Sequence, residues 1–343
     1  MMASNDHARA PAVSVIMPAR NAAATIGAAV ASALRQDVPD LEVVIAVGPS
    51  EDGTEAVAAQ LATDPRVQVV ENPSGVTPAA LNAAIAASTG DILVRLDAHA
   101  ELPDGYVPIA VAVSQATGAG NVGGRQVPVA EAGTAAAVAA AMRSPLGSGG
   151  AAYRSGTEAG PVETVYLGVF RREALAAVGG FDEGLLRNQD YELNHRLIEA
   201  GWQVWFDPRL AVTYHPRGSL RALAAQYRDY GRFKRVVMRR HPSSVRPRQL
   251  APLVMVTAVV LAVAFGAVTG AWWLPGLVCG GYLALVLVGG VVADPRRAPL
   301  VAGALATMHW SWAVGFLQGT RVTATRVGAP APGATGDVSD DSP

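Results

Sequence analysis

A run of 45 residues without a charged side chain, Gln249 to Ala293, places the strongest constraint on how this chain can fold. Because a helix needs about 20 apolar residues to cross a bilayer, the run is long enough for two crossings, with a tight connection at residues 270–275. A second uncharged run of 23 residues, 298–320, also carries polar and aromatic side chains, so it either crosses the bilayer or lies in the interface. The sequence therefore predicts a membrane region at residues 250–320, built from two or three helices.

The charges that precede this region indicate its orientation. Between Arg217 and Arg248 there are ten Lys or Arg residues and one acid, Asp229. A solvated helix face could carry such charges, but next to apolar helices they mark the cytoplasmic side and attract anionic lipids. Residues 1–11 lack the apolar stretch of a secretory signal. We therefore expect a multi-pass protein of the cytoplasmic membrane, with its first 250 residues in the cytoplasm, a basic juxtamembrane linker at 236–249 and membrane lipids as partners.

The ends of the chain and its cysteine content add further limits. A third crossing would leave Arg321 and Arg326 on the far side of the membrane, against the preference of arginine for the cytoplasm. Residues 321–343 are rich in Pro, Gly, Ala and Asp, and we expect them, like residues 1–11, to be disordered. The single cysteine, Cys279, excludes a disulfide framework and a cysteine metal site. No nucleic-acid partner is expected.

Strand and helix patterns alternate over the first 130 residues, which predicts a mostly parallel sheet with helices on both faces. Loops that follow parallel strands in this order meet at one edge of the sheet, where open α/β sheets bind ligands. The residues expected to converge at that edge are Pro18, Arg20, Asn21, Asp52 and Asp97. The expected strands are residues 13–17, 41–47, 67–70 and 92–96, and the expected helices are residues 22–34, a segment ending near 61, and 77–88, which carries Asn82.

The fourth of these strands ends at an Asp-X-His pair, Asp97 and His99. A carboxylate oxygen and an imidazole nitrogen two residues apart can both reach a divalent cation that also holds a diphosphate. The pair therefore suggests nucleotide-sugar chemistry with Mn²⁺ or Mg²⁺, and Mn²⁺ suits an imidazole slightly better. An aspartate that caps the next turn, beside a solvent-exposed histidine, is the alternative.

The second half of the chain carries two further candidates. Asp190 begins a helix whose apolar residues Leu193, Leu197 and Ile198 recur at helical spacing. It is either a general base that faces the cleft or a carboxylate that caps the helix and is favoured by the helix dipole. His215 follows another apolar strand, and it is either a hydrogen-bonded structural group or a third ligand of the metal or diphosphate.

Taken together, these residues resemble those of a family 2 glycosyltransferase with the nucleotide-diphospho-sugar transferase (GT-A) fold. No single match is specific, and the resemblance rests on their order and spacing over about two thirds of the chain. The matching segments are residues 13–21, 72–73, 79–83, 97–100, 179–183 and 188–190.

Within that family the chain is most similar to the succinoglycan-biosynthesis type, whose members carry three further motifs before C-terminal membrane segments. Ser-Pro-X-Gly-X-Gly-Gly is found here at residues 144–150, Arg-Asn-Gln-Asp-X-Glu at 187–192 and Gln-Tyr-X-X-Tyr-Gly at 226–231. The resemblance implies a GT-A domain at 12–235 that acts as a metal-dependent, inverting hexosyltransferase. Its donor would be a nucleotide-diphospho-sugar, and its acceptor a lipid-linked or cell-envelope glycan in exopolysaccharide synthesis at the cytoplasmic face of the membrane.

The resemblance also implies roles for single residues. Asp97 would bind the donor and the metal, with His99 and His215 as further metal ligands, and Asp190 would accept the proton of the acceptor hydroxyl. The other residues implied in nucleotide-sugar binding are Pro18, Ala19, Arg20, Asn21, Asp52, Asn82 and Arg95.

Two positions depart from the family pattern. An acidic pair usually ends the second strand and accepts a hydrogen bond from the nucleobase, but Val47 and Gly48 stand here, so that base recognition falls to another residue such as Asp52. The second aspartate of the usual Asp-X-Asp is replaced by His99.

Two other functions compete with a single-sugar transferase. A catalytically silent GT-A scaffold or binding protein is suggested by Val47 and Gly48, while the intact Asp97 and Asp190 oppose it. A processive polysaccharide synthase would need several membrane spans and a Gln-X-X-Arg-Trp motif, whereas Gln226 is followed by Tyr-Arg-Asp-Tyr.

Overall fold

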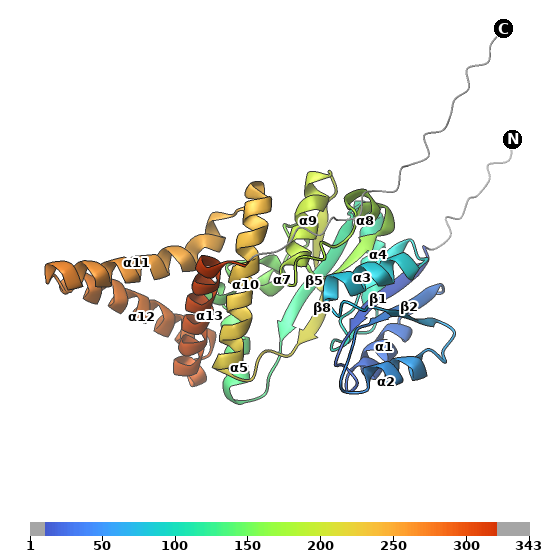
Figure 1. Ribbon diagram of the computed structural model, residues 1–343, viewed down its shortest axis with the longest axis horizontal. Helices are drawn as coiled ribbons and strands as arrows, with labels where there is room; N and C mark the ends of the chain where they lie inside the picture. The colour runs from blue at the N-terminus through green and yellow to red at the C-terminus, as the bar shows by residue number, and fades with distance from the viewer. Residues whose placement is uncertain (1–10, 321–343) are drawn as a thin grey trace, which may run out of the picture.

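The computed structural model describes residues 11–320 (Figure 1). The described residues form one eight-stranded sheet in the order β3-β2-β1-β4-β7-β5-β8-β6, with long helices at the C-terminal end. The disorder predicted for residues 321–343, and for all but the last of residues 1–11, falls outside the described residues. The mixed, mostly parallel sheet with helices on both faces confirms the predicted α/β class.

The strands are β1 (Val13–Ala19), β2 (Leu41–Val47), β3 (Val67–Glu71), β4 (Ile92–Arg95), β5 (Asn121–Pro128), β6 (Gly160–Pro161), β7 (Tyr166–Arg171) and β8 (Val204–Tyr214). The helices before the C-terminal group are α1 (Ile26–Leu34), α2 (Thr54–Leu61), α3 (Thr77–Ala87), α4 (Tyr106–Thr117), α5 (Gly133–Arg143), α6 (Pro145–Ser148), α7 (Ala152–Ser155), α8 (Arg172–Val178) and α9 (Gln189–Glu199). The C-terminal group is α10 (Leu220–Arg240), α11 (Pro247–Thr269), α12 (Trp273–Ala293) and α13 (Ala298–Gln318), with 3-10 turns η1 (Pro242–Ser244) and η2 (Pro295–Arg297).

Apolar strands at the centre of the sheet are covered on both faces, as their continuous hydrophobic runs predict. One face of β1, β2 and β4 packs against α1, α2 and α4 around Ile26 and Leu102. The other face packs against α3, α8 and α9 around Leu81, Phe181 and Leu197. The four strands β3-β2-β1-β4 run parallel, so their carboxyl ends lie at one edge. That edge is where the sequence predicts the ligand.

The antiparallel strand β7 extends this edge toward the second half of the chain. It pairs with β4 so that Val169 lies opposite Val94, which places its first residue, Tyr166, beyond the end of β4. On its other side it pairs with β5, which in turn pairs in parallel with β8. The carboxyl end of β8, Tyr214, therefore faces the same side as Asp97, which follows β4.

Three C-terminal helices, residues 247–269, 273–293 and 295–318, are long and apolar enough to cross a membrane, with mean hydropathies of 2.4, 2.2 and 1.4. Figure 1 shows α11 and α12 as a hairpin that projects away from the sheet, while α13 lies beside α10. α13 packs into a third core with α5 and α10, around Val138, Leu223 and Leu305. The most apolar part of α13 is 44% buried, against 22% for α11 and 11% for α12.

Two glycines allow α10 and α13 to approach closely. A Cβ atom on Gly231 would lie 2.1 Å from the carbonyl oxygen of Trp312, and one on Gly315 would lie 1.9 Å from that of Arg228. Both distances are far below a van der Waals contact, and both neighbours are backbone atoms that cannot turn aside. The two helices can therefore pack at this distance only with glycine at both positions.

We expect Gly315→Ala to lower the thermal unfolding temperature of the purified protein, because a methyl group must push the backbone of α10 away. Overpacking of this kind costs about 1–3 kcal/mol. Gly303→Ala is the matched control in the same helix, since a Cβ there would meet only the tip of Leu220 at 4.0 Å. Equal unfolding temperatures for the two variants in detergent would contradict the close packing of α10 on α13.

Candidate active site

A single cavity of about 970 Å³ lies at the carboxyl edge of the sheet and extends toward the C-terminal helices. Its volume is at the upper end of the range for small-molecule sites. Residues from the loop after β1, the end of β4, the start of β7 and the start of α9 line one part of it. Most of the predicted site residues line this cavity, namely Pro18, Ala19, Arg20, Asn21, Arg95, Asp97, His99 and Asp190.

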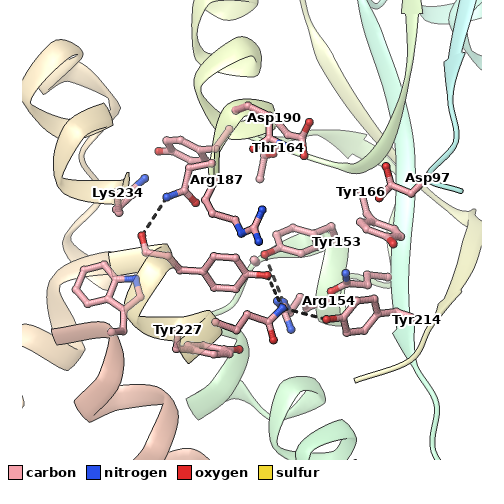
Figure 2. A pocket seen from close by; sticks show the side chains of 18 of the residues that line it. Asp97, Tyr153, Arg154, Thr164, Tyr166, Arg187, Asp190, Tyr214, Tyr227 and Lys234 are labelled. Carbon is pink, nitrogen blue, oxygen red and sulfur yellow. Dashed lines mark hydrogen bonds between the residues drawn. The ribbon is translucent and has the colours of Figure 1, made fainter. Parts of the chain in front are cut away.

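Asp97 and Asp190, which are 93 residues apart in the sequence, meet through one buried arginine. The guanidinium of Arg95 donates to Oδ1 of Asp97 at 3.0 Å and to Oδ1 of Asp190. The side chain of Arg95 is only 7% exposed, whereas that of Asp190 is 43% exposed and faces the cavity. Figure 2 shows both carboxylates in the same pocket. The two acids therefore share one crevice. Their bonds to Arg95 explain the positions of both carboxylates, so that neither needs a role in capping a helix or a turn.

Although its side chain is open to the cavity, Asp190 is surrounded by protein, and this desolvation raises its pKa above the ordinary value. The positive charge of Arg95 opposes this rise, and the negative charge of Asp97 adds to it. For Arg95 itself, the nearby carboxylates outweigh the effect of burial and raise the pKa, so the guanidinium keeps its charge. A carboxylate with a raised pKa is a better proton acceptor, which is what a general base needs.

Three predicted site residues do not line the cavity. Both oxygens of Asp52 hold its own turn, since they accept from the backbone of Ala23 at 2.9 Å and from the hydroxyl of Thr54 at 2.5 Å. Asn82 binds both the backbone N–H and the carbonyl of Phe181, each at 2.9 Å. His215 is exposed beyond the end of β8. Their roles in ligand binding stay predictions, and the hydrogen bonds of Asp52 and Asn82 give these two residues a structural role as well.

The residues that replace the usual acidic pair are explained by packing. Val47 ends β2 inside the core, and a Cβ on Gly48 would lie 3.0 Å from Cα of Gly75. Arg20 spans the same place, because its side chain donates to the carbonyls of Pro49 at 3.2 Å and Gly75 at 3.3 Å. Arg20 and Gly75 line the cavity here, where a nucleobase would be expected.

Backbone strain gathers at the cavity. Among the described non-glycine residues, positive φ occurs at Asn21 (48°), Leu167 (45°) and Asn188 (61°). Asn21 and Asn188 line the cavity, and Leu167 follows Tyr166, which also lines it. Such conformations cost of the order of 1–3 kcal/mol each, and they persist where the surrounding structure holds a functional geometry.

Asp97 and His99 supply a donor set that fits a divalent cation. Arg95 binds Oδ1 of Asp97, which leaves Oδ2 for a metal, and His99, which is exposed, also lines the cavity. One carboxylate oxygen and one imidazole nitrogen, completed by diphosphate oxygens and water, suit Mn²⁺ or Mg²⁺.

A second group of metal-type side chains lies outside the cavity. His195, Glu199 and His241 bring their ligand atoms within 4.8 Å of one another at the end of α9. Hydrogen bonds already occupy these groups, since His195 contacts Glu199 at 3.1 Å and His241 contacts Glu192 at 3.1 Å. The group therefore ties α9 to the end of α10.

Several cavity residues were not singled out by the sequence. They include Glu163, Tyr166 and Lys234. Two motifs could have pointed to others, because the Ser-Pro-X-Gly-X-Gly-Gly segment at 144–150 and the Gln-Tyr-X-X-Tyr-Gly segment at 226–231 both supply cavity residues.

Comparison with known proteins agrees with this fold. The glycosyl transferase family 2 model matches residues 14–179. The chain is 36% identical over 323 residues to the succinoglycan biosynthesis protein ExoA of Rhizobium meliloti (strain 1021), which covers 91% of this chain and 96% of the relative. It is 24% identical over 239 residues to a dolichyl N-acetyl-alpha-D-glucosaminyl phosphate 3-beta-D-2,3-diacetamido-2,3-dideoxy-beta-D-glucuronosyltransferase of Methanococcus voltae, covering 66% of this chain and 74% of the relative.

Among solved structures, the mannosyltransferase PcManGT from Pyrobaculum calidifontis, in complex with GDP-Man and Mn²⁺, superposes with a TM-score of 0.63 at 22% identity. The match covers 90% of this chain and 87% of that chain. This likeness confirms the predicted GT-A fold. With the identity to the succinoglycan protein extending over nearly the whole chain, the protein belongs to the family 2 glycosyltransferases.

Proposed function

We propose that this glycosyltransferase moves a sugar from a nucleotide-diphospho-sugar to a lipid-linked glycan at the cytoplasmic face of the membrane, with inversion at the anomeric carbon. The observation that carries the proposal is the crevice in which Arg95 joins Asp97 and Asp190. The carboxylates face a cavity whose far wall is formed by the apolar C-terminal helices. Donor chemistry and a membrane-derived acceptor can therefore meet in one space.

In this proposal the donor lies along the edge of the sheet. Pro18, Ala19, Arg20 and Asn21 line the nucleotide end, and Asp97 with His99 holds the divalent cation at the diphosphate. When bound, the cation neutralises the charge that grows on the departing diphosphate. The Mn²⁺ and GDP-Man in the mannosyltransferase structure and the dolichyl phosphate sugar named for the archaeal relative support this donor and acceptor chemistry.

Asp190 acts as the general base in a single displacement. Its carboxylate accepts the proton of the acceptor hydroxyl while the hydroxyl oxygen attacks the anomeric carbon from the face opposite the diphosphate. Arg95 positions both carboxylates, because one guanidinium binds Asp190 and Asp97 at once. A fixed geometry of this kind lets the base and the metal ligand act on the two sides of the same sugar.

Membrane topology follows from the shape of the C-terminal region. We propose that α11 and α12 cross the bilayer as a hairpin, with the exposed Trp272 and Trp273 at the far interface. Two crossings return the chain to the cytoplasmic side at Arg296 and Arg297, near the catalytic domain, where Arg297 donates to the carbonyl of Glu131. α13 then lies in the interface against α10, which removes the conflict that a third crossing creates for the positive-inside rule.

The transferase proposal is tested by screening labelled nucleotide-sugars with membranes that contain the protein, in Mn²⁺, Mg²⁺ or EDTA. Sugar should pass to the organic-extractable fraction with at least one donor, only when a divalent cation is present. Protein that binds nucleotide but neither transfers nor hydrolyses any donor would instead favour the silent scaffold suggested by Val47 and Gly48.

We expect Arg95→Gln to move the acidic limb of the rate profile to higher pH. A base must be deprotonated, so the rate rises with pH through the pKa of Asp190. Removing the cation that lowers this pKa, while leaving the negative charge of Asp97, raises the pKa further. The measurement is kcat against pH, with Arg209→Gln as control, because Arg209 pairs with Asp207 outside the cavity. An acidic limb at the wild-type position in Arg95→Gln would contradict the assignment of this limb to Asp190.

A further inference from the structure

The chemistry described above assigns no role to a side chain in the inner half of the cavity. This half extends from Asp190 to α6, α7 and the C-terminal helices. We propose that this inner half binds a phosphate group carried on a lipid, with Arg154 and Lys234 as the anion-binding side chains. The inference rests on the proposed function and deepens it, because it assigns the place where the acceptor is held.

Arg154 is a cation without an anionic partner. Its Nε donates to the hydroxyl of Tyr153 at 3.3 Å, while its Nη1 is shielded from solvent and has no hydrogen-bond partner among residues 11–320. No carboxylate of the described residues forms an ion pair with it. A guanidinium stays charged at any physiological pH, and a shielded charge is costly unless an ion of opposite sign lies beside it. Arg154 also lines the cavity, so that an anion bound there would compensate its charge.

Tyrosine hydroxyls surround this arginine. Figure 2 shows Arg154 among Tyr153, Tyr214 and Tyr227. The side-chain amide of Gln226 donates to the hydroxyls of Tyr214 at 3.1 Å and Tyr230 at 2.8 Å, so each of these hydroxyls can donate its own proton elsewhere. Hydroxyl donors around a guanidinium fork suit the several oxygens of a phosphate group.

Lys234 supplies a second cation on another wall of the same cavity. Its side chain comes from α10 and is 6% exposed, and its ammonium lies 3.3 Å from the centre of the Tyr191 ring. Burial lowers the pKa of Lys234 to about 7, while the charge of Glu163 opposes this shift. Glu163 is paired with Arg246 and Arg248, and no carboxylate of the described residues forms an ion pair with Lys234. An anion bound nearby would favour its charged form.

Apolar side chains of α6 and of the helices that can cross a membrane form part of the cavity wall. Leu146 of α6, Pro252 and Met255 of α11, Leu285 of α12 and Met308 of α13 all line the cavity. The outer surfaces of α11 and α12 expose large apolar side chains, such as Leu261 and Leu277, at 64% and 66%. A ligand with an anionic head and a long apolar chain matches both the cations and the apolar surfaces, whereas a soluble phosphate matches only the cations.

The donor diphosphate is a different anion with a different place. It is expected at Asp97 and His99, at the end of β4, where a cation compensates its charge. Arg154 comes from α7 and Lys234 from α10, and neither contacts Asp97. Substitution of Arg154 should therefore affect the lipid and spare the nucleotide.

The test measures binding of a polyprenyl phosphate to the full-length protein in detergent, with polyprenol and inorganic phosphate as comparison ligands. We expect polyprenyl phosphate to bind more tightly than either. Arg154→Gln should weaken this binding by roughly tenfold or more, as loss of a charge-assisted hydrogen bond does, and Lys234→Met should weaken it as well. Arg239→Gln removes an exposed charge from α10 and should leave the binding unchanged.

Nucleoside diphosphate binding in Mn²⁺ is measured on the same samples and should be equal in all variants. Equal affinity for polyprenyl phosphate and polyprenol would overturn the proposal, and equal affinity for inorganic phosphate would overturn its lipid part. Weaker nucleotide binding in Arg154→Gln with unchanged lipid binding would assign this cation to the donor. If Arg154→Gln fails to fold, the affinity for polyprenyl phosphate is measured with Arg154→Lys and Lys234→Met instead. If the protein binds the lipid phosphate but transfers no sugar, the transferase proposal is refuted and the lipid-phosphate proposal is not.

Discussion

Asp190→Asn should reduce sugar transfer by about 10² to 10⁴-fold while nucleotide affinity stays near the wild-type value. The amide keeps the size of the side chain and can still contact Arg95, but it cannot accept the proton of an attacking hydroxyl. Loss of general base catalysis has this magnitude. The measurements are the transfer rate at saturating donor and the dissociation constant of the nucleoside diphosphate in Mn²⁺.

Glu199→Gln is the matched control for this prediction. Glu199 lies on the same helix, α9, but outside the cavity, where it contacts His195. Its substitution should leave the transfer rate within a factor of about two, since exposed surface substitutions rarely disturb a fold. Wild-type turnover in purified Asp190→Asn would show that another group accepts the proton.

Asp97→Ala should instead act on donor binding, and only when metal is present. Loss of the carboxylate removes a predicted metal ligand, and changes around such ligands cost roughly 10–100-fold in metal affinity or activity. We therefore expect metal-dependent nucleotide affinity to fall at least tenfold. In EDTA, titrations of wild type and variant should give the same weak binding.

Asp91→Ala tests whether this effect is specific. Asp91 precedes the same strand, β4, at its opposite end, where it accepts from the backbone of Ala12. It should bind nucleotide as the wild type does. Nucleotide titrations that coincide for Asp97→Ala and wild type in Mn²⁺ would exclude Asp97 as a ligand of the metal.

The parallel half of the sheet could be predicted from the sequence because each strand is a short, continuous apolar run bounded by turn residues. Residues 41–47 were predicted as a strand and form β2 with the same bounds. The first helix begins at Ile26 rather than at residue 22, because the carbonyl of Ala22 accepts hydrogen bonds from the backbone of Thr25 and Ile26 in a preceding turn. The local sequence pattern determines which helices and strands form, while tertiary contacts determine the residues at which they begin and end.

The family resemblance predicted that Asp97 and Asp190 share one crevice and counted Arg95 among the nucleotide-sugar-binding residues, but it did not predict that Arg95 joins the two carboxylates. Arg95 follows three apolar residues of β4, and nothing in that pattern reveals that its side chain spans both carboxylates. The inner cavity was likewise hidden, since Arg154 and Lys234 come to line the same cavity only when the chain is folded. The proximity of residues that are far apart in the sequence depends on tertiary packing and not on the local periodicity of the sequence.

Asp52 and Asn82 show a second limit of prediction from the sequence. Polar residues in loops near a predicted site look alike whether they bind a ligand or hold a turn. In this chain Asp52 satisfies backbone N–H groups beside β2, and Asn82 holds the turn at Phe181. Both residues satisfy backbone groups in this structure, and the sequence carries no signal that separates this role from ligand binding.

The location of bound manganese tests the central claim most directly. Crystals of the protein grown with Mn²⁺ and a nucleoside diphosphate, measured at the manganese absorption edge, give the metal position by anomalous scattering. The account predicts a peak between Asp97 and the diphosphate, inside the cavity that Asp190 also faces. A peak found only at His195, Glu199 and His241, with the diphosphate away from Asp97, would contradict it.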